Sequence, residues 1–204
     1  AEIGVLTALF GITGGSGSGK TSVSKMLEKL GVHIIDTDVI AHEIVEPNSD
    51  CLNELVDYFG DSILNDDKTL NRKKLASIAF SDKQKTEALS NITHKYIKAE
   101  VVKDINTTDA ELVGIDGAVI IGSNIEPLCE FIVSVIADKQ SRITRIKTRD
   151  NITDEQAIQR INAQNDDEFY KENSMYIIYN NGDITQLESD VVVLFNKIKG
   201  NSFE

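Results

Sequence analysis

Short apolar runs, each followed by glycine or polar residues, dominate the hydrophobic pattern of this chain. Runs of this length are typical of strands buried on both faces, as in a parallel sheet that helices cover on both sides. They predict strands at residues 6–12, 32–35, 111–115, 131–136 and 175–179. We expect the second of these strands to lie beside the first.

Between the predicted strands, apolar residues recur three and four positions apart, which is the spacing of an amphipathic helix. This spacing predicts helices at residues 22–30, 39–45, 139–148 and 184–198, and another that begins near Thr153 or Asp154. From about residue 48 to residue 102 the pattern is helical throughout. Strands that alternate with helices predict an α/β fold of three layers, with a parallel five-strand sheet in the middle.

The most specific chemical signal follows the first predicted strand. The run Gly14-Gly15-Ser16-Gly17-Ser18-Gly19-Lys20-Thr21 matches the phosphate-loop pattern G-x-x-x-x-G-K-[ST] at every fixed position. Its glycines let the backbone turn N–H groups toward a phosphate, and the next helix adds the partial positive charge of its N-terminus. We therefore expect the loop to bind a nucleotide, with Lys20 at the β- and γ-phosphates and the Thr21 hydroxyl on Mg²⁺.

Carboxylates follow two of the predicted strands, at the sheet edge where ligands bind in parallel α/β folds. Asp36 and Asp38 come directly after the second strand, and Asp116 follows the third. We expect a catalytic or Mg²⁺-linked role for Asp36 or Asp38, whereas the alternative is that one of them only caps the next helix. Asp116 stands where a carboxylate can hold Mg²⁺ through water.

Basic side chains outside the loop gather in two helical regions. Arg72 is either a contact for an anionic substrate or an ordinary surface arginine, and His94 is either a substrate contact or a plain polar residue. Arg142, Arg145 and Arg149 are spaced to lie on or near one face of a helix. With the helix that follows, they predict a lid over the transferring phosphate, or else a solvated basic helix that balances an acidic protein.

The overall charge narrows the class of partner. The 204 residues carry a formal charge of −12, and 41% of them are hydrophobic. This charge argues against nucleic acid or an anionic membrane as the partner, and no apolar stretch is long enough to span a bilayer. Cys51 and Cys129 lack disulfide or zinc-site spacing and are typical of thiols in a reducing cytosol. We therefore expect a cytoplasmic protein that acts on small molecules.

With these residues in view, the chain resembles the dephospho-CoA kinases from about Leu9 to Lys199. The family's loop T-G-G-x-G-S-G-K-[ST] corresponds to residues 13–21, and its D-x-D element, which runs on to a proline, corresponds to residues 36–47. Its L-[ND]-R-x-x-L element and following phenylalanine correspond to residues 70–80. Its R-D and A-x-x-R-I-x-x-Q elements lie within residues 149–164, and its I-x-N-x-G element lies at residues 178–182.

The resemblance implies a phosphate-loop kinase that transfers the γ-phosphoryl group of ATP, with Mg²⁺, to the ribose 3′-hydroxyl of dephospho-CoA. This reaction is the last step of coenzyme A biosynthesis. The expected architecture is a single domain over residues 1–204, with a helical acceptor-binding insertion at about 48–105 and a lid at about 145–172. A monomer or a small homo-oligomer is expected.

The resemblance also implies roles for individual residues. Lys20 holds the donor, Asp38 contacts the acceptor and orients or deprotonates its hydroxyl, and Arg149 neutralises the transferring group. The implied metal ligands are Thr21, Asp36 and Asp116, and the implied nucleotide contacts are Gly15, Ser16, Gly17, Ser18, Gly19, Lys20, Thr21, Asn180 and Gly182. The implied acceptor contacts, besides Asp38, are Arg72, Phe80 and His94.

The chain departs from the family pattern after the third predicted strand. The family reads P-L-L-x-E there, whereas this chain has Ala118 and Gly122 in place of the proline and the glutamate. A nucleoside or nucleotide kinase on the same scaffold is one alternative function. A non-catalytic ATP-binding protein is another, because the missing glutamate lies near the expected acceptor side.

Overall fold

The computed structural model describes residues 6–200, which contain a single sheet of five parallel strands. The strands are β1 (Ala8–Thr13), β2 (His33–Asp36), β3 (Leu112–Asp116), β4 (Phe131–Ile136) and β5 (Tyr176–Tyr179). Their spatial order is β2-β3-β1-β4-β5, with parallel pairing throughout. The predicted five-strand parallel sheet is therefore confirmed.

The expectation that β2 lies beside β1 is wrong, because β3 lies between them. Burial explains this order. Every residue of β3 is buried, whereas β2 has a single buried residue, Ile35. Apart from its last residue, Asp116, β3 consists of apolar residues and glycine, so it is stabilised most in the middle of the sheet, and β2, which begins with His33, takes the edge.

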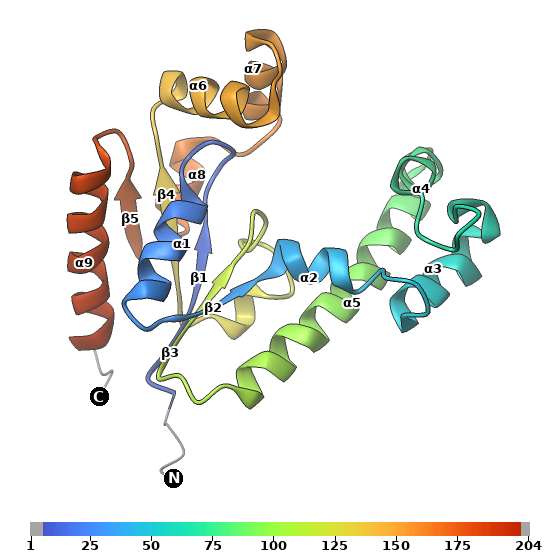
Figure 1. Cartoon of the computed structure of the whole chain (residues 1–204), viewed down its shortest axis with the longest axis horizontal. Helices are drawn as coiled ribbons and strands as arrows, with labels where there is room; N and C mark the ends of the chain where they lie inside the picture. The colour runs from blue at the N-terminus through green and yellow to red at the C-terminus, as the bar shows by residue number, and fades with distance from the viewer. Residues whose placement is uncertain (1–5, 201–204) are drawn as a thin grey trace. The chain divides into compact units, whose positions relative to one another are not determined.

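Helices cover both faces of the sheet. The helices α1 (Lys20–Lys29) and α9 (Ile184–Gly200) pack side by side on one face (Figure 1). Phe131, Val133 and Val135 of β4 belong to the core on that face, so Ser134 points to the other face, since side chains alternate along a strand. There its Oγ lies 2.6 Å from Oγ of Ser174, which follows α8 (Asp167–Glu172).

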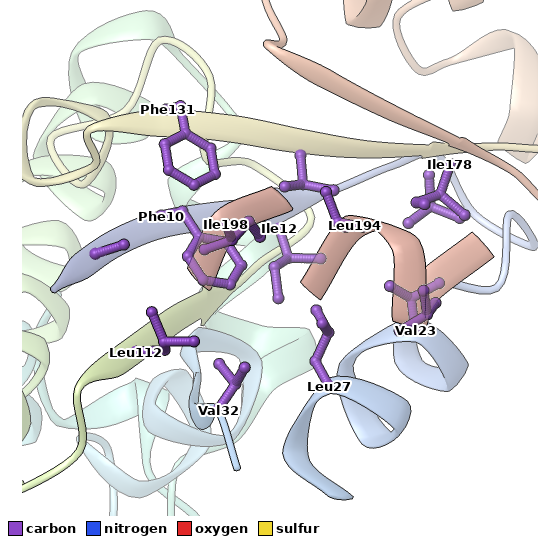
Figure 2. Packing of buried hydrophobic residues seen from close by; sticks show 14 of the residues in the cluster. Phe10, Ile12, Val23, Leu27, Val32, Leu112, Phe131, Ile178, Leu194 and Ile198 are labelled. Atoms are coloured by element: carbon purple, nitrogen blue, oxygen red, sulfur yellow. The ribbon is translucent and has the colours of Figure 1, made fainter. Parts of the chain in front are cut away.

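The main core lies between the sheet and the pair α1 and α9. Figure 2 shows Phe10 and Ile12 of β1 facing Leu27 of α1 and Leu194 of α9. The rings of Phe10 and Phe131 stack with their centroids 5.3 Å apart. Because this packing joins the strand before the phosphate-loop run to the helix after it, the loop is anchored at both ends.

The predicted lid region forms a hairpin of two helices with a small core of its own. The helices are α6 (Lys139–Asp150) and α7 (Asp154–Asn162), and a capping box begins α7 at Thr153, one of the two residues expected there. Ile143 and Ile146 of α6 pack with Ala157 and Ile161 of α7.

The chain divides into two compact units, which we call the sheet unit and the helical unit. Within the described chain, the sheet unit consists of residues 6–36 and 108–200 and also contains the short 3₁₀ helix η2 (Glu126–Leu128). The helical unit, residues 37–107, contains the whole predicted insertion. Its helices are α2 (Thr37–Glu43), α3 (Asp50–Phe59), η1 (Asp61–Ile63), α4 (Arg72–Ala79) and α5 (Lys83–Thr107).

Two polar contacts join α3 to α5 inside the helical unit. Lys95 Nζ lies 2.5 Å from Glu54 Oε2, and the Tyr96 hydroxyl donates to the same oxygen at 2.7 Å. These hydrogen bonds, with that of Lys95 the larger cause, lower the pKa of Glu54.

Among residues 6–200, no helix is both long and apolar enough to cross a membrane.

Candidate functional site

The run 14–21 forms a tight loop between the end of β1 and the start of α1. Gly17 and Gly19 have φ angles of +76° and +94°, in the left-handed region that favours glycine. A Cβ atom at Gly17 would also lie 2.7 Å from the Arg142 carbonyl oxygen, and one at Gly19 would collide with Nδ2 of Asn180. The glycines of the motif are therefore required by both backbone conformation and space.

Asp116, at the end of β3, lies against the loop lysine. Its Oδ1 forms an ion pair with Lys20 Nζ, and its Oδ2 accepts a hydrogen bond of 2.7 Å from the Ser24 hydroxyl. The Asp116 side chain is 5% exposed. The structure thus brings together the predicted donor-binding lysine and one of the predicted metal ligands.

Asp36 lies at the same edge of the sheet as Asp116. The register of β2 on β3 makes Asp36 and Asp116 direct neighbours, and Thr21 follows Lys20 in the first turn of α1. One hydroxyl and two carboxylates form an oxygen-only donor set, which suits a hard cation such as Mg²⁺. Within residues 6–200 no group of three or more His, Cys, Asp or Glu residues is arranged to hold a metal. A magnesium site here would therefore also need phosphate or water oxygens.

Asp38 belongs to the helical unit and does not lie in an extended segment. The helix α2 begins at Thr37, directly after β2, so Asp38 stands inside its first turn and is not the residue before the helix. The alternative that one of the two carboxylates caps the next helix therefore does not apply to Asp38, whereas Asp36 is the residue directly before that helix. Its backbone carbonyl oxygen lies 2.8 Å from Nδ1 of His42.

The segment after β5 contacts the loop through Asn180. This side chain is buried, and its Nδ2 donates to the Ser18 carbonyl oxygen at 2.8 Å. Arg145 of α6 joins the same two segments, since it donates to the carbonyl oxygens of Gly17 at 3.1 Å and Asn180 at 3.0 Å. Gly182 lies in the exposed turn between β5 and α9.

Two further residues bind the loop, although the sequence predicted no contact with the loop for either of them. Arg142 of α6 and Gln164, just after α7, both form hydrogen bonds to Ser16. Burial lowers the pKa of Arg142, whose side chain is only 7% exposed. The family-like A-x-x-R-I-x-x-Q stretch, which ends at Gln164, was the one signal that could have drawn attention to this glutamine.

Arg149, the arginine expected to neutralise the transferring group, lies at the outer end of the hairpin. It donates to both oxygens of Asp150, at 2.7 and 2.8 Å, and Arg160 forms a second ion pair with the same carboxylate. The hydrogen bonds from Arg149, the largest cause, lower the pKa of Asp150 to about 2. Arg149 has donors beyond the two used here, since a guanidinium carries five N–H groups.

Three of the four predicted acceptor residues line one pocket of the helical unit, and Asp38 is not among its lining residues. Arg72, Phe80 and His94 line a cavity of about 290 Å³ whose other lining residues are Ala41, Ile44, Val45, Leu55, Leu70, Leu75, Ala76, Leu89, Thr93 and Ile97. Arg72 begins α4 directly after its cap residue Asn71, and Phe80 is 68% exposed at the end of that helix. The pocket combines one cation and one exposed aromatic ring with an apolar lining.

Gly122 explains one departure from the family pattern. Its φ is +79°, in the left-handed region, and its N–H donates to the carboxylate of Glu126 at 2.5 Å. A glutamate at this position would strain the backbone, because a Cβ atom disfavours that conformation. The loop after β3 therefore takes a shape here that suits glycine.

Comparison with known proteins identifies relatives over nearly the whole chain. The family model described as dephospho-CoA kinase matches residues 8–186. A dephospho-CoA kinase of Lactobacillus johnsonii is 34% identical over 196 residues, which are 95% of this chain and 99% of that protein.

Two solved structures share the fold. A dephospho-CoA kinase from Campylobacter jejuni is 27% identical, with a TM-score of 0.68 over 95% of this chain and 98% of that one. A Thermus thermophilus protein is 24% identical, with a TM-score of 0.81 over 93% of this chain and 97% of that one. These matches support the assignment of the sheet and loop described above to the phosphate-loop kinase fold.

Proposed function

The chain belongs to the dephospho-CoA kinase family, and on that premise we propose that it transfers the γ-phosphoryl group of ATP to the ribose 3′-hydroxyl of dephospho-CoA. The observation that carries the proposal is the complete phosphate loop, with Lys20 against Asp116 at the carboxyl edge of the sheet. Phosphoryl transfer needs little covalent help from a protein, so positioning and charge neutralisation account for most of the catalysis.

The donor side is assigned to the loop and its neighbours. Lys20 binds the β- and γ-phosphates, which requires that its ammonium group leave or share the Asp116 carboxylate. Asn180, which already bonds the loop at Ser18, and Gly182 lie near the adenine in this proposal. Arg149 offers its unused N–H donors to the transferring group, and Asp150 keeps the guanidinium oriented.

The residues proposed to hold Mg²⁺ are Thr21, Asp36 and Asp116, and their oxygen-only donor set fits this cation. When bound, Mg²⁺ would supply positive charge at the phosphate oxygens. Asp116 is held in place for this role by the Ser24 hydroxyl.

The acceptor side is assigned to the helical unit. Asp38 orients the 3′-hydroxyl and accepts its proton, because a carboxylate in hydrogen-bond reach makes a poor nucleophile more reactive. Arg72 pairs with an anionic group of dephospho-CoA, while Phe80, His94 and the apolar lining of their pocket contact its less polar part. The formal charge of −12 makes such local cationic groups necessary for anionic substrates and disfavours nucleic acid as a partner. We also propose that the protein is cytoplasmic and is a monomer or a small homo-oligomer.

A panel of acceptors tests this function. Purified protein is incubated with ATP and Mg²⁺ and with dephospho-CoA, nucleosides or nucleoside monophosphates, and the products are separated by chromatography. We expect phosphorylation of dephospho-CoA, and none when Mg²⁺ is chelated. Brisk turnover of a nucleoside or nucleotide without turnover of dephospho-CoA would replace the assignment with the alternative kinase. ATP binding without any turnover would identify a non-catalytic ATP-binding protein.

A further inference from the structure

Each polar atom of Ser16 in the phosphate loop is bonded to a side chain from the base of the helical hairpin. Its N–H donates to Gln164 Oε1 at 2.8 Å, and its hydroxyl oxygen accepts from Gln164 Nε2 at 3.1 Å. Its carbonyl oxygen accepts from Arg142 Nε at 2.8 Å. Because the two ends of the Gln164 amide meet a donor and an acceptor of the same residue, the orientation of this amide is specified.

Arg142 also braces Gln164 and carries a charge that is poorly neutralised. Its Nη2 donates to Gln164 Oε1 at 3.3 Å, whereas the carboxylate of Asp167 lies 3.9 Å from Nη1, beyond hydrogen-bond distance. The whole residue is only 6% exposed. A buried guanidinium against an anion-binding loop adds positive potential there, because it is weakly screened by solvent.

Direct packing of α6 on the loop reinforces these bonds. A Cβ atom at Gly15 would collide with the Arg142 guanidinium, and one at Gly17 would lie 3.0 Å from both Cα of Arg142 and Cγ1 of Ile146. The loop backbone therefore rests on α6 with no room for side chains between them. Contact and hydrogen bonding thus hold the same few residues of the loop.

We propose that Arg142 and Gln164 are positioning residues, a Ser16 clamp that holds the phosphate loop in its nucleotide-binding conformation before the nucleotide arrives. Without the clamp, the loop spends part of its time in other conformations, and the apparent dissociation constant rises in inverse proportion to the competent fraction. The proposal rests on the nucleotide-binding role proposed for the loop. It adds that donor affinity depends on two side chains that need not touch the nucleotide.

The test is Gln164→Met, which keeps the length of the side chain and removes both hydrogen bonds to Ser16 as well as the one from Arg142. We expect the dissociation constant for Mg²⁺–ADP, measured by calorimetry, and the KM for ATP to rise by about tenfold, the effect of one well-placed hydrogen bond on an equilibrium. The KM for dephospho-CoA should stay within about twofold, since a positioning effect on the donor loop leaves acceptor binding alone. Gln159→Met, at an exposed position of α7, is the matched control and should bind ADP like the wild type.

A double-mutant cycle with Ser16→Ala distinguishes the clamp from a nonspecific loss of structure in Gln164→Met. Ser16→Ala removes only the bond from Gln164 Nε2, so it should weaken ADP binding about threefold in the wild type and not at all in Gln164→Met. Arg142→Met should weaken ADP binding in the same direction. If Gln164→Met does not fold, Ser16→Ala and Arg142→Met decide together: weaker ADP binding in both supports the clamp, and unchanged affinity in Ser16→Ala overturns it.

Other outcomes would also overturn the clamp. They are an unchanged ADP affinity in folded Gln164→Met, additive effects of the two substitutions, or an equal rise of both KM values. An unchanged affinity in folded Arg142→Met removes the arginine from the proposal. Wild-type protein that fails to bind ADP would instead contradict the proposed function itself, so the two failures are distinguishable.

Discussion

At the scale of single residues, the structure gives Lys20 a second role besides the proposed contact with the donor phosphates. Its ammonium group is the ion-pair partner of Asp116, whose side chain is 5% exposed. Removing one partner of a buried pair is costly, because the remaining charge keeps its desolvation penalty without compensation. A substitution at Lys20 is therefore expected to affect stability as well as catalysis.

We predict that Lys20→Ala lowers turnover by at least about a hundredfold, because one well-placed charge contact to the transition state is lost. We also predict that it lowers the free energy of unfolding by about 3 kcal/mol, measured by urea denaturation. The double variant Lys20→Ala with Asp116→Asn should regain much of the stability and none of the turnover. Turnover of Lys20→Ala within about tenfold of wild type would remove Lys20 from the donor site.

Asp38 is the residue proposed as general base. We predict that Asp38→Asn lowers turnover by about a hundredfold or more, the range that general-base catalysis supplies, while both KM values change only modestly. Steady-state kinetics with ATP and dephospho-CoA measures this. Asp36→Asn is the matched comparison, since Asp36 ends β2 beside Asp116 and is proposed to hold Mg²⁺. Loss of ATP affinity in Asp38→Asn with turnover retained would exchange the two roles.

At the scale of elements, ion pairs of one carboxylate link the two helices of the hairpin, α6 and α7. Asp150, the last residue of α6, pairs with Arg149 beside it and with Arg160 of α7. The pKa of Asp150 is lowered to about 2, with the hydrogen bonds from Arg149 as the largest cause and the hydrogen bond and charge of Arg160 as further causes. A carboxyl group with a lowered pKa in the folded state stabilises that state only while it is ionised.

This shift predicts a pH window for stability. The contribution of Asp150 is present above the unfolded pKa of about 4 and is lost as the pH falls through the folded pKa of about 2. The melting temperature of wild type should therefore exceed that of Asp150→Asn at pH 5, and the difference should close between about pH 4 and pH 2. Glu155→Gln, an exposed change on α7, controls for the altered net charge. A difference that is independent of pH would show that the ion pairs do not stabilise the hairpin.

At the scale of the whole molecule, the two compact units are proposed to bind different substrates. The phosphate loop and its contacts with Arg142, Arg145, Gln164 and Asn180 all belong to the sheet unit. The pocket lined by Arg72, Phe80 and His94 belongs entirely to the helical unit. Donor and acceptor binding should therefore be separable in experiments on the intact chain.

We predict that hydrogen exchange separates the two sites. Mg²⁺–ADP alone should slow exchange in residues 14–21, and dephospho-CoA alone should slow it in the helices around the pocket, α4 and α5. Some amides exchange only after a local opening of the protein that releases the ligand. At a ligand concentration of ten times the dissociation constant, exchange at these amides should slow by about tenfold. Mass spectrometry of peptides from the whole protein measures this. Protection by dephospho-CoA confined to the sheet unit would contradict the proposed acceptor pocket.

Local patterns in the sequence determined the fold class, the positions of the strands and the family. A short apolar run indicates a buried strand, and residues 131–136 form the strand that this pattern predicts. The glycines of the loop also predicted a tight turn, since the left-handed backbone conformations of Gly17 and Gly19 are a local property of the chain. The family model that matches residues 8–186 confirms the resemblance that these motifs indicated.

Only the tertiary structure decided which elements are neighbours and which side chains meet. The place of β2 at the edge depended on how its residues compare with those of β3, since both strands compete for the centre of the sheet, and the pattern of β2 alone does not decide this. The bonds from Arg142 and Gln164 to Ser16 join residues 126 and 148 positions apart, and they form because the hairpin packs on the loop. A hydrophobic pattern shows that a helix face is buried but not against what, so partners of this kind come from packing alone.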